Sequence, residues 1–140
     1  MSFRVDSKYI QDAERKLGVT FPLMFRGMMM RDNGGSFDAA GETWWLHPIL
    51  DTGDGKRAGR TCNDMVRETN AARRRPGFPP TAVAIGNNRD GDELILLPKP
   101  DQPGELDPAV FRWDHKTHEV QRLADDFAEL PNSEEPDLNE

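Results

Sequence analysis

The sequence lacks the features that mark secreted and membrane proteins. It has one cysteine, Cys62, among 140 residues, so no internal disulfide can form and we expect a reducing cytoplasmic compartment. No apolar run approaches the roughly 20 residues that a membrane helix needs. Residues 1–6 contain no apolar segment of the kind that a signal peptide requires. These absences predict a cytoplasmic protein that does not contact a membrane.

Motifs of common enzymes and cofactor sites are also missing. Gly55-Lys56 does not complete a phosphate-binding loop, because Leu50 stands where the motif needs glycine. The histidines and Cys62 show no paired spacing typical of a zinc site, and no serine lies in a Gly-x-Ser-x-Gly motif. A lone cysteine in the first turn of a predicted helix is typical of an ordinary helix residue. The sequence therefore predicts no enzyme, no catalytic residue, no cofactor and no metal site.

Charge is distributed unevenly along the chain. The net charge is −7, and residues 121–140 contribute most of it, so residues 1–120 are nearly neutral. Residues 56–75, in contrast, are strongly basic, which suggests that different faces meet different partners. The run Arg73-Arg74-Arg75 could contact phosphates, but no aromatic residue interleaves it. We interpret it as a charged helix end and predict no direct contact with nucleic acid.

Two short apolar runs at the centre of the chain indicate the core of the fold. Residues 82–85 and 94–97 are rich in β-formers, and polar residues 86–93 join them. Neither run alternates with polar residues, so both of its faces should be covered. We predict two central strands that lie under helices.

The first two helices are predicted from their ends and their apolar spacing. Residues 7–17 follow N-cap candidates at 6–7 and precede Gly18, a residue typical of helix C-termini. The second helix is expected to begin with Pro22 at its first position, where a missing N–H costs little. Gly27 within it weakens the helix, so we expect it to permit close packing.

Two further helices are predicted later in the chain. Thr61 and Asp64 resemble a capping box, which predicts a third helix over about 62–74. Asp125 is expected to cap a short last helix. The inward-facing residues of that helix are predicted to be Phe127, Ala128 and Leu130.

The remaining segments are interpreted as strands and loops. Residues 36–49 contain a strand around Trp44-Trp45, and 50–60 form a glycine-bearing loop. Residues 110–113 and 119–123 flank a five-residue connection, the pattern of a hairpin.

Together these elements predict an α+β fold. It is a single domain with a mostly antiparallel central sheet, covered by the N-terminal, middle and C-terminal helices. Residues 1–130 would form the domain, and residues 131–140 would form an acidic, frayed tail.

Several segments, taken in order, follow a known pattern that spreads over residues 10–130. They are Phe21-Pro22 with Phe25, Asn33-Gly34-Gly35, Trp45-Leu46-His47-Pro48, Ala84-Ile85-Gly86 through Gly91-Asp92-Glu93-Leu94, Val110 to His115, and Phe127 to Leu130. Each motif alone is loose, but their order and spacing resemble the SUKH superfamily. This superfamily includes bacterial immunity proteins of polymorphic toxin systems and fungal cell-wall-synthesis regulators of the SMI/KNR type.

The resemblance implies an α+β fold and a non-enzymatic binding role inside the cell. The role most common in the superfamily is to neutralise a toxin domain by direct contact, and many such toxins are nucleases with basic grooves. The alternative is a regulatory scaffold that binds a host signalling or cell-wall-synthesis protein. We therefore expect a protein partner, and a chain that is a monomer or a weak dimer.

The polar loop of the central strand pair carries the densest acidic cluster of the chain, namely Asp90, Asp92 and Glu93. An EF-hand calcium loop placed here would need ligands at Gly86 and Leu97, and neither residue can serve. A looser metal site, a solvated strand connection and a partner-facing loop remain as interpretations of this cluster.

Acidic loops would complement a basic groove on a partner, and an exposed tryptophan would anchor such an interface. Adjacent Trp44 and Trp45 point to opposite faces of a strand; one should be core, and burial is the favoured interpretation of the other. The predicted partner-binding residues are Asp51, Asp54, Trp44, Asp90, Asp92 and Glu93.

Overall fold

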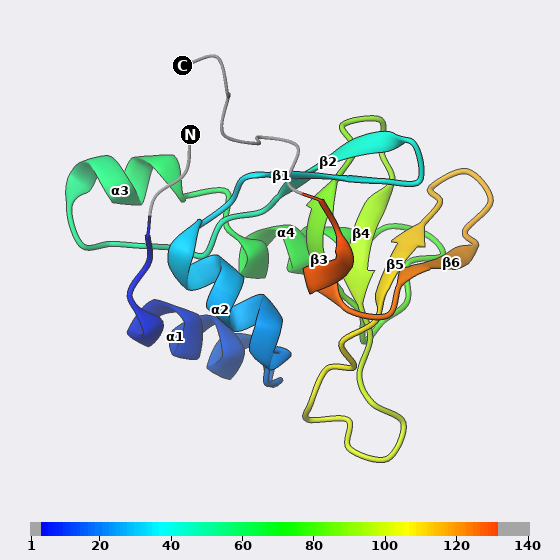
Figure 1. Cartoon of the computed structure of the whole chain (residues 1–140), viewed down its shortest axis with the longest axis horizontal. Helices are drawn as coiled ribbons and strands as arrows, with labels where there is room; N and C mark the ends of the chain where they lie inside the picture. Colours follow the sequence, from blue (N-terminus) through cyan, green and yellow to red (C-terminus); the bar gives the residue numbers. More distant parts are fainter. Residues whose placement is uncertain (1–3, 132–140) are drawn as a thin grey trace.

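The computed structural model describes residues 4–131 and shows an α+β fold, as predicted (Figure 1). Its centre is an antiparallel sheet whose strands follow one another in chain order, from β1 to β6. The strands are β1 (Ser36–Ala39), β2 (Glu42–Leu46), β3 (Val83–Asn87), β4 (Glu93–Leu96), β5 (Val110–Trp113) and β6 (Val120–Ala124). The helices are α1 (Ser7–Leu17), α2 (Leu23–Arg31), α3 (Gly55–Arg60), α4 (Met65–Ala72) and the 3₁₀ helix η1 (Phe127–Glu129).

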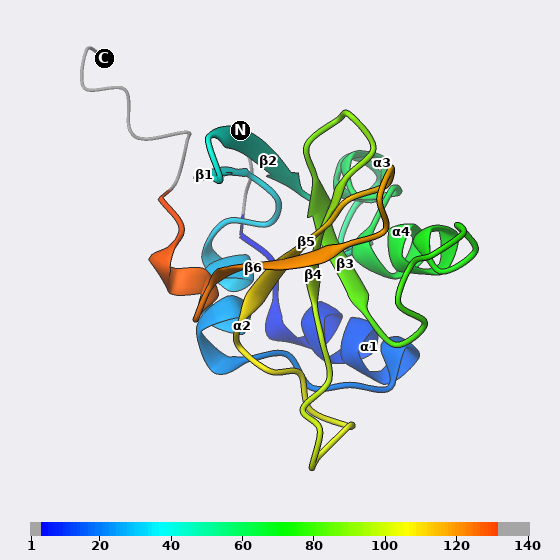
Figure 2. The ribbon, with the colours of Figure 1, turned by 90° about the vertical axis from the view of Figure 1, so that its right-hand side faces the viewer.

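The two central strands are buried on both faces, which confirms the prediction from residues 82–97. One face of β3 and β4 joins the main core with α1, α2 and η1, and the opposite face packs against the end of α4. Figure 2 shows α2 and η1 on one side of the sheet and α4 on the other. The residues of the main-core face are Val83, Ile85, Leu94 and Leu96, and those of the opposite face are Ala84 and Ile95.

Helix α1 has the bounds that the sequence predicted. Asp6 is its N-cap and accepts a hydrogen bond from the backbone N–H of Lys8, and Gly18 ends it with a φ of 73°. Ile10 and Ala13 face the core. Local capping chemistry therefore suffices to define this helix.

Helix α2 differs from the prediction in two respects. Pro22 is its N-cap rather than its first helical residue, a shift of one position. The expectation that Gly27 permits close packing is wrong within this chain, because a Cβ there would meet only the Nη1 atom of Arg31, at 3.9 Å.

Residues 36–49 form a hairpin rather than one strand. Strand β1 pairs with β2, and the turn between them uses Ala40 and Gly41, both with positive φ. The prediction of a loop over 50–60 is also incomplete, because residues 55–60 form α3. Asp54 caps α3 by accepting a hydrogen bond from the backbone N–H of Arg57, at 2.8 Å.

The predicted capping box at the third helix is wrong. Helix α4 begins at Met65, and its cap is Asp64, which accepts a hydrogen bond from Arg67 N–H. The Thr61 hydroxyl instead accepts a hydrogen bond from the backbone N–H of Asp51, at 2.9 Å. Cys62 is exposed and precedes the helix, so it does not lie in a first helical turn.

The C-terminal part of the described chain confirms the β5–β6 hairpin but corrects the last helix. Asp126, not Asp125, caps η1, and Ala128 is exposed while Phe127 and Leu130 are buried. Residues 132–140, most of the predicted acidic tail, lie outside the described residues. Among residues 4–131, no helix is long and apolar enough to span a membrane.

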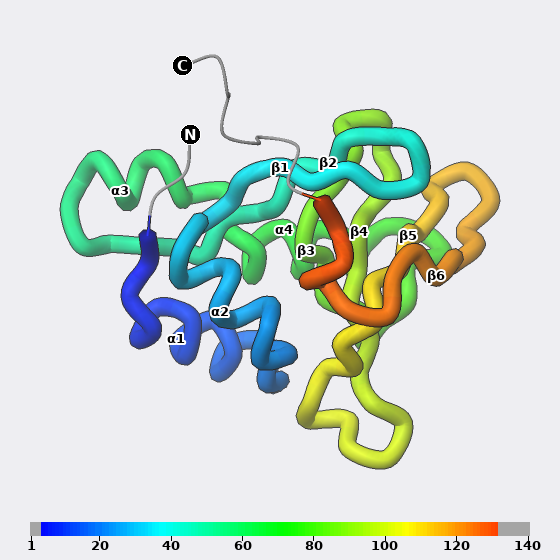
Figure 3. The backbone as a smooth tube through the Cα atoms, viewed as in Figure 1, coloured from blue at the N-terminus to red at the C-terminus, as the bar shows by residue number. Residues whose placement is uncertain are grey.

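The connection from β4 to β5, residues 97–109, projects from one end of the sheet (Figure 3). A bridge between Pro98 and Leu106 closes it, and a second bridge joins Glu105 to Thr20, just before α2. This loop therefore lies at the opposite end of the sheet from the β3–β4 loop.

Candidate functional site

The connections β1–β2, β3–β4 and β5–β6 meet at one end of the sheet. This follows from the strand order, because alternate connections in an antiparallel meander lie at the same end. Between them lies an open, polar hollow with a volume of about 310 Å³. Its lining residues are Glu42, Asn88, Asp90, Asp92, Arg112, Asp114, His115 and Lys116.

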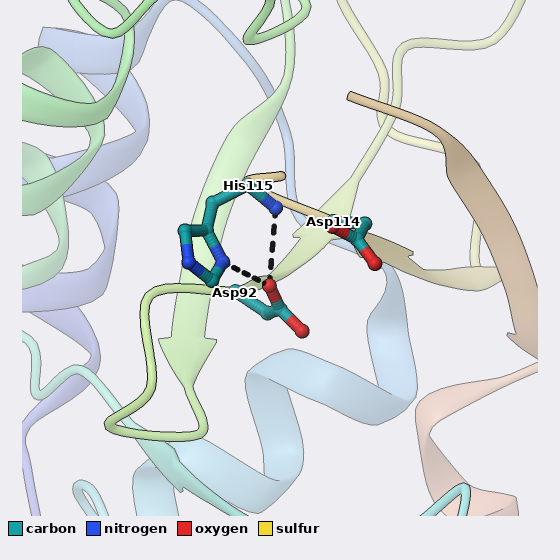
Figure 4. A group of neighbouring side chains, drawn as sticks. All are labelled: Asp92, Asp114 and His115. Carbon is teal, nitrogen blue, oxygen red and sulfur yellow. Dashed lines mark hydrogen bonds and ion pairs between the residues drawn. The ribbon is translucent and has the colours of Figure 1, made fainter. Parts of the chain in front are cut away.

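Asp92 connects other residues of the hollow through its hydrogen bonds. Only 4% of the residue is exposed, and its carboxylate accepts hydrogen bonds from both the backbone N–H and the Nδ1 of His115 (Figure 4). Its other oxygen accepts hydrogen bonds from Arg112, with Nε at 3.0 Å. Burial alone raises the pKa of Asp92, but the hydrogen bonds from His115 and Arg112 outweigh it and lower the pKa to about 2. Asp92 is therefore ionised at any physiological pH.

Arg112 connects three parts of the sheet, one of which, β2, is not adjacent to the other two. From β5 its guanidinium reaches Asp92 before β4 and Glu42 on β2, the latter with 3.0 Å between Nη1 and Oε2. The hydrogen bond with Asp92 raises the pKa of Arg112, and the nearby Glu42 adds to this effect. The Arg112 side chain also lies 5.7 Å from the ring centroid of Trp44. These contacts hold the hollow in one arrangement.

The β3–β4 loop is shaped by Asn88. Its side-chain oxygen accepts hydrogen bonds from the backbone N–H groups of Asp90 and Asp92, at 2.9 and 3.2 Å. Its amide donates to Glu42, at 2.9 Å. The chain then turns through Gly91, whose φ is 111° and whose Cβ, if present, would lie 3.0 Å from the His115 ring. The loop leaves Asp90 exposed at the rim of the hollow.

Asp114 and Lys116 complete the rim from the β5–β6 connection. The Asp114 carboxylate accepts hydrogen bonds from the backbone N–H groups of Lys116 and Thr117, which lower its pKa. Asp114 therefore presents a negative charge at the mouth of the hollow.

Asp92, Asp114 and His115 bring three potential ligand atoms within 4.8 Å of one another (Figure 4). The donor set does not fit a metal ion, because both Asp92 oxygens already accept hydrogen bonds and Arg112 supplies the positive charge there. A cation at this position would have to displace a guanidinium from a buried carboxylate. The cluster is better suited to a rigid surface than to metal binding.

The structure separates the acidic residues that the sequence grouped together. Asp90 and Asp92 lie in the hollow, but Glu93 points to the opposite face of the sheet, where Arg75 and His47 contact it at 3.2 and 3.4 Å. Successive side chains of a strand alternate between faces, which explains the separation. Glu93 is 8% exposed, so it supports β4 rather than offering a surface charge.

The other predicted partner-binding residues lie outside the hollow. Asp51 is 1% exposed, and its side chain accepts a hydrogen bond from Gly53 N–H. Asp54 is exposed, and it caps α3. Trp44 has no exposed surface, and its indole N–H donates to the Ala39 carbonyl, so it is a core residue and not a surface anchor. Trp45 is half-buried under the guanidinium of Arg89, at 3.8 Å from the ring centroid.

Sequence analysis missed six of the eight residues that line the hollow, namely Glu42, Asn88, Arg112, Asp114, His115 and Lys116. The available signal was the order of the hairpins, since loops of alternate connections share one end of a meander. This signal places the β3–β4 and β5–β6 connections together without β1. Only the place of Glu42 depends on β1, which the sequence pattern did not separate from β2.

Comparison with known proteins gives one positive result. The family model described as SMI1 / KNR4 family (SUKH-1) matches residues 4–133. No curated protein and no solved structure matches the chain significantly.

Proposed function

The chain belongs to the SMI1/KNR4 family (SUKH-1), and from this premise we propose that it is an immunity protein that neutralises a toxin domain by direct contact. The family implies protein–protein interaction, either as immunity proteins or in roles of the SMI1/KNR4 type. The proposal goes further by naming the toxin as the partner and the hollow as the contact surface. It requires no catalytic step by this chain.

One observation carries the proposal. Three loops that are distant in sequence bring carboxylates to one hollow, and the buried Asp92 holds two of these loops while Arg112 and Asn88 hold Glu42 of the third. A surface that is already ordered loses little conformational entropy on binding. Most interface energy usually comes from such centrally placed, well-supported groups.

The charge of the hollow indicates the kind of partner. Its lining includes four carboxylates against the two cations Arg112 and Lys116. Arg112 is engaged by Glu42 and Asp92, which leaves Asp90 and Asp114 as the outward negative charges. Such a surface complements a basic groove, for example that of a nuclease toxin.

The direct test is protection of cells. The chain is co-expressed with the toxin domain encoded by the adjacent reading frame, and growth is measured. We expect wild type to protect, Asp90→Lys to protect poorly, and Asp101→Lys to protect fully. Asp101 is an exposed acid in the 97–109 loop, so its variant carries the same charge change away from the hollow. Failure of wild type to protect, or equal effects of the two variants, would contradict the proposal.

The family name supports a second candidate, a regulatory scaffold that binds a signalling or cell-wall-synthesis protein. Affinity capture from the host cell distinguishes the two candidates. Recovery of such a protein by wild type but not by Asp90→Lys, with no protection against the toxin domain, would favour the scaffold.

A further inference from the structure

Helix α2 is apolar on both of its sides. Phe25 and Met29 are fully buried in the main core, as one side of a surface helix should be. The outer side nevertheless presents Leu23, Met24 and Met30, which are 80%, 52% and 41% exposed. A surface helix normally turns polar residues to solvent, whereas a helix that is apolar all round is normally covered. Figure 1 shows α2 on the side of the molecule nearest the viewer, with nothing drawn in front of it.

Gly27 lies at the centre of this outer side. It is four residues after Leu23 and three before Met30, so the three residues share one stripe. Glycine in a helix interior costs about 1 kcal/mol relative to alanine. No contact within the described chain requires it, since a Cβ would meet only the tip of Arg31, at 3.9 Å. A missing side chain here would instead let a second helix approach closely, because the distance between packed helices depends on the side chains at the crossing.

The two ends of the outer side carry opposite charge. Beside the N-terminal end is an apolar groove of about 300 Å³, lined by Leu23, Met24 and Leu106, with Glu105 and Asp126 outweighing Lys99. Beside the C-terminal end is an open hollow whose charged lining residues are Arg4, Arg31 and Arg57 against Asp6. The first end is therefore acidic and the second basic.

We propose that α2 is the contact helix of a symmetric homodimer in which two copies cross antiparallel at Gly27. A two-fold axis through Gly27 places the basic, Met30 end of each helix against the acidic, grooved end of the other. Met30 of each copy then faces the apolar groove of the other copy, and the charges of the two ends attract. In a parallel or heterologous arrangement, the acidic end of each helix could not contact the basic end of the other in both copies at once.

The expected dimer is weak. A nine-residue helix is only about 13 Å long, so the contact falls below the size of a standard stable interface. None of the residues that line the hollow of the candidate site lines the two surfaces beside α2. The dimer is therefore independent of the proposed toxin contact.

Sedimentation equilibrium over a micromolar to millimolar concentration series tests the proposal. We expect wild type to dimerise and Met30→Glu to raise the dimer Kd at least about tenfold, which corresponds to 1.4 kcal/mol. Val120→Glu is the matched control, because Val120 on β6 is also 41% exposed, and it should leave the Kd unchanged. A wild-type chain that stays monomeric throughout the series, or equal effects of both variants, would overturn the proposal.

Cross-linking tests the position of the two-fold axis. Helix axes about 8–10 Å apart bring facing Cα atoms within the range that a disulfide spans. In a Cys62→Ser background, Gly27→Cys should form a covalent dimer on mild oxidation, and Val120→Cys should not. Gly27→Gln should stabilise the monomer fold yet weaken the dimer, a combination that a purely structural role of Gly27 would not produce. Absence of the cross-link in a wild-type-like dimer would place the contact elsewhere and overturn the proposal.

Discussion

The buried carboxylate of Asp92 holds several residues of the candidate site in position. The residue precedes β4, yet it reaches Arg112 on β5 and His115 in the next connection. Removing its charge would leave Arg112 with Glu42 alone and would loosen two of the three loops of the hollow. The residue therefore serves the candidate site mainly by positioning its neighbours.

The depressed pKa of Asp92 predicts a specific dependence of stability on pH. Its folded-state pKa of about 2 lies below the usual unfolded value of about 3.9, so ionised Asp92 stabilises the fold above that unfolded value. This contribution, about 2 kcal/mol, is lost as pH falls from about 5 towards 2. Urea denaturation across that range should show wild type losing its advantage over Asp92→Asn. A constant difference between the two proteins would contradict the assignment.

Neighbouring acids in a sequence need not share a role. Asp90, Asp92 and Glu93 form one cluster in the sequence. In the structure Asp90 is exposed, Asp92 is buried in the hollow, and Glu93 points to the opposite face of the sheet. The alternation of side chains along a strand was available from the sequence. The sequence did not show which of these side chains would point to which face of the sheet, because this depends on the packing of helices that are distant in the chain.

At the scale of elements, alanine substitutions at two glycines, one in a strand and one in a helix, should change the stability of the fold in opposite directions. Gly86 lies in β3, where a Cβ would be 2.6 Å from the Trp45 carbonyl oxygen, a backbone atom that cannot easily move. Gly86→Ala should therefore destabilise the fold by about 1–3 kcal/mol or more. Gly27→Ala should stabilise it by up to about 1 kcal/mol, because the space is open and α2 gains helix propensity.

Thermal or urea unfolding of the two variants, in dilute monomeric samples, measures whether their changes in stability have the opposite signs that we expect. Each variant is the control for the other, since both replace glycine with alanine inside a regular element. A loss of stability in Gly27→Ala would mean that the chain itself needs glycine there. It would also remove the main reason to assign Gly27 to an intermolecular contact.

Elements whose boundary signals are local could be predicted, and the others could not. Helix α1 was predicted to the residue because Asp6 and Gly18 act on their own backbone neighbours. The start of α4 was misplaced because Thr61 and Asp64 are both competent caps. Only the tertiary contact of Thr61 with Asp51 decides between them.

For the whole molecule, the two proposed contacts should be separable. The hollow lies at the end of the sheet formed by alternate connections, and the α2 contact lies on a helix that covers the main core. We expect Met30→Glu to lose the dimer but keep protection against the toxin domain. Asp90→Lys should show the reverse. Sedimentation and the growth assay on the same two proteins measure both properties.

Two results would contradict this separation. Loss of protection in Met30→Glu would mean that α2 contacts the toxin or that the dimer is the active form. Loss of dimerisation in Asp90→Lys would mean that the hollow takes part in self-association. The Asp101→Lys and Val120→Glu variants control for nonspecific effects of a new charge in the two assays.

The sequence by itself determined the fold class, the two central strands, the closing hairpin and the family resemblance that the SMI1/KNR4 match confirms. These properties follow from the spacing of apolar residues and from local turn and capping chemistry, which a linear pattern carries. Only the tertiary structure decided which polar groups meet. Asp92 and Arg112 come together because β4 pairs with β5, and the long Arg112 side chain also reaches Glu42 on β2, beyond β3 and β4. Helix α2 is left half-covered because the remaining chain packs against its other side. Both outcomes depend on contacts between residues far apart in the chain, for which no short stretch of sequence holds the information.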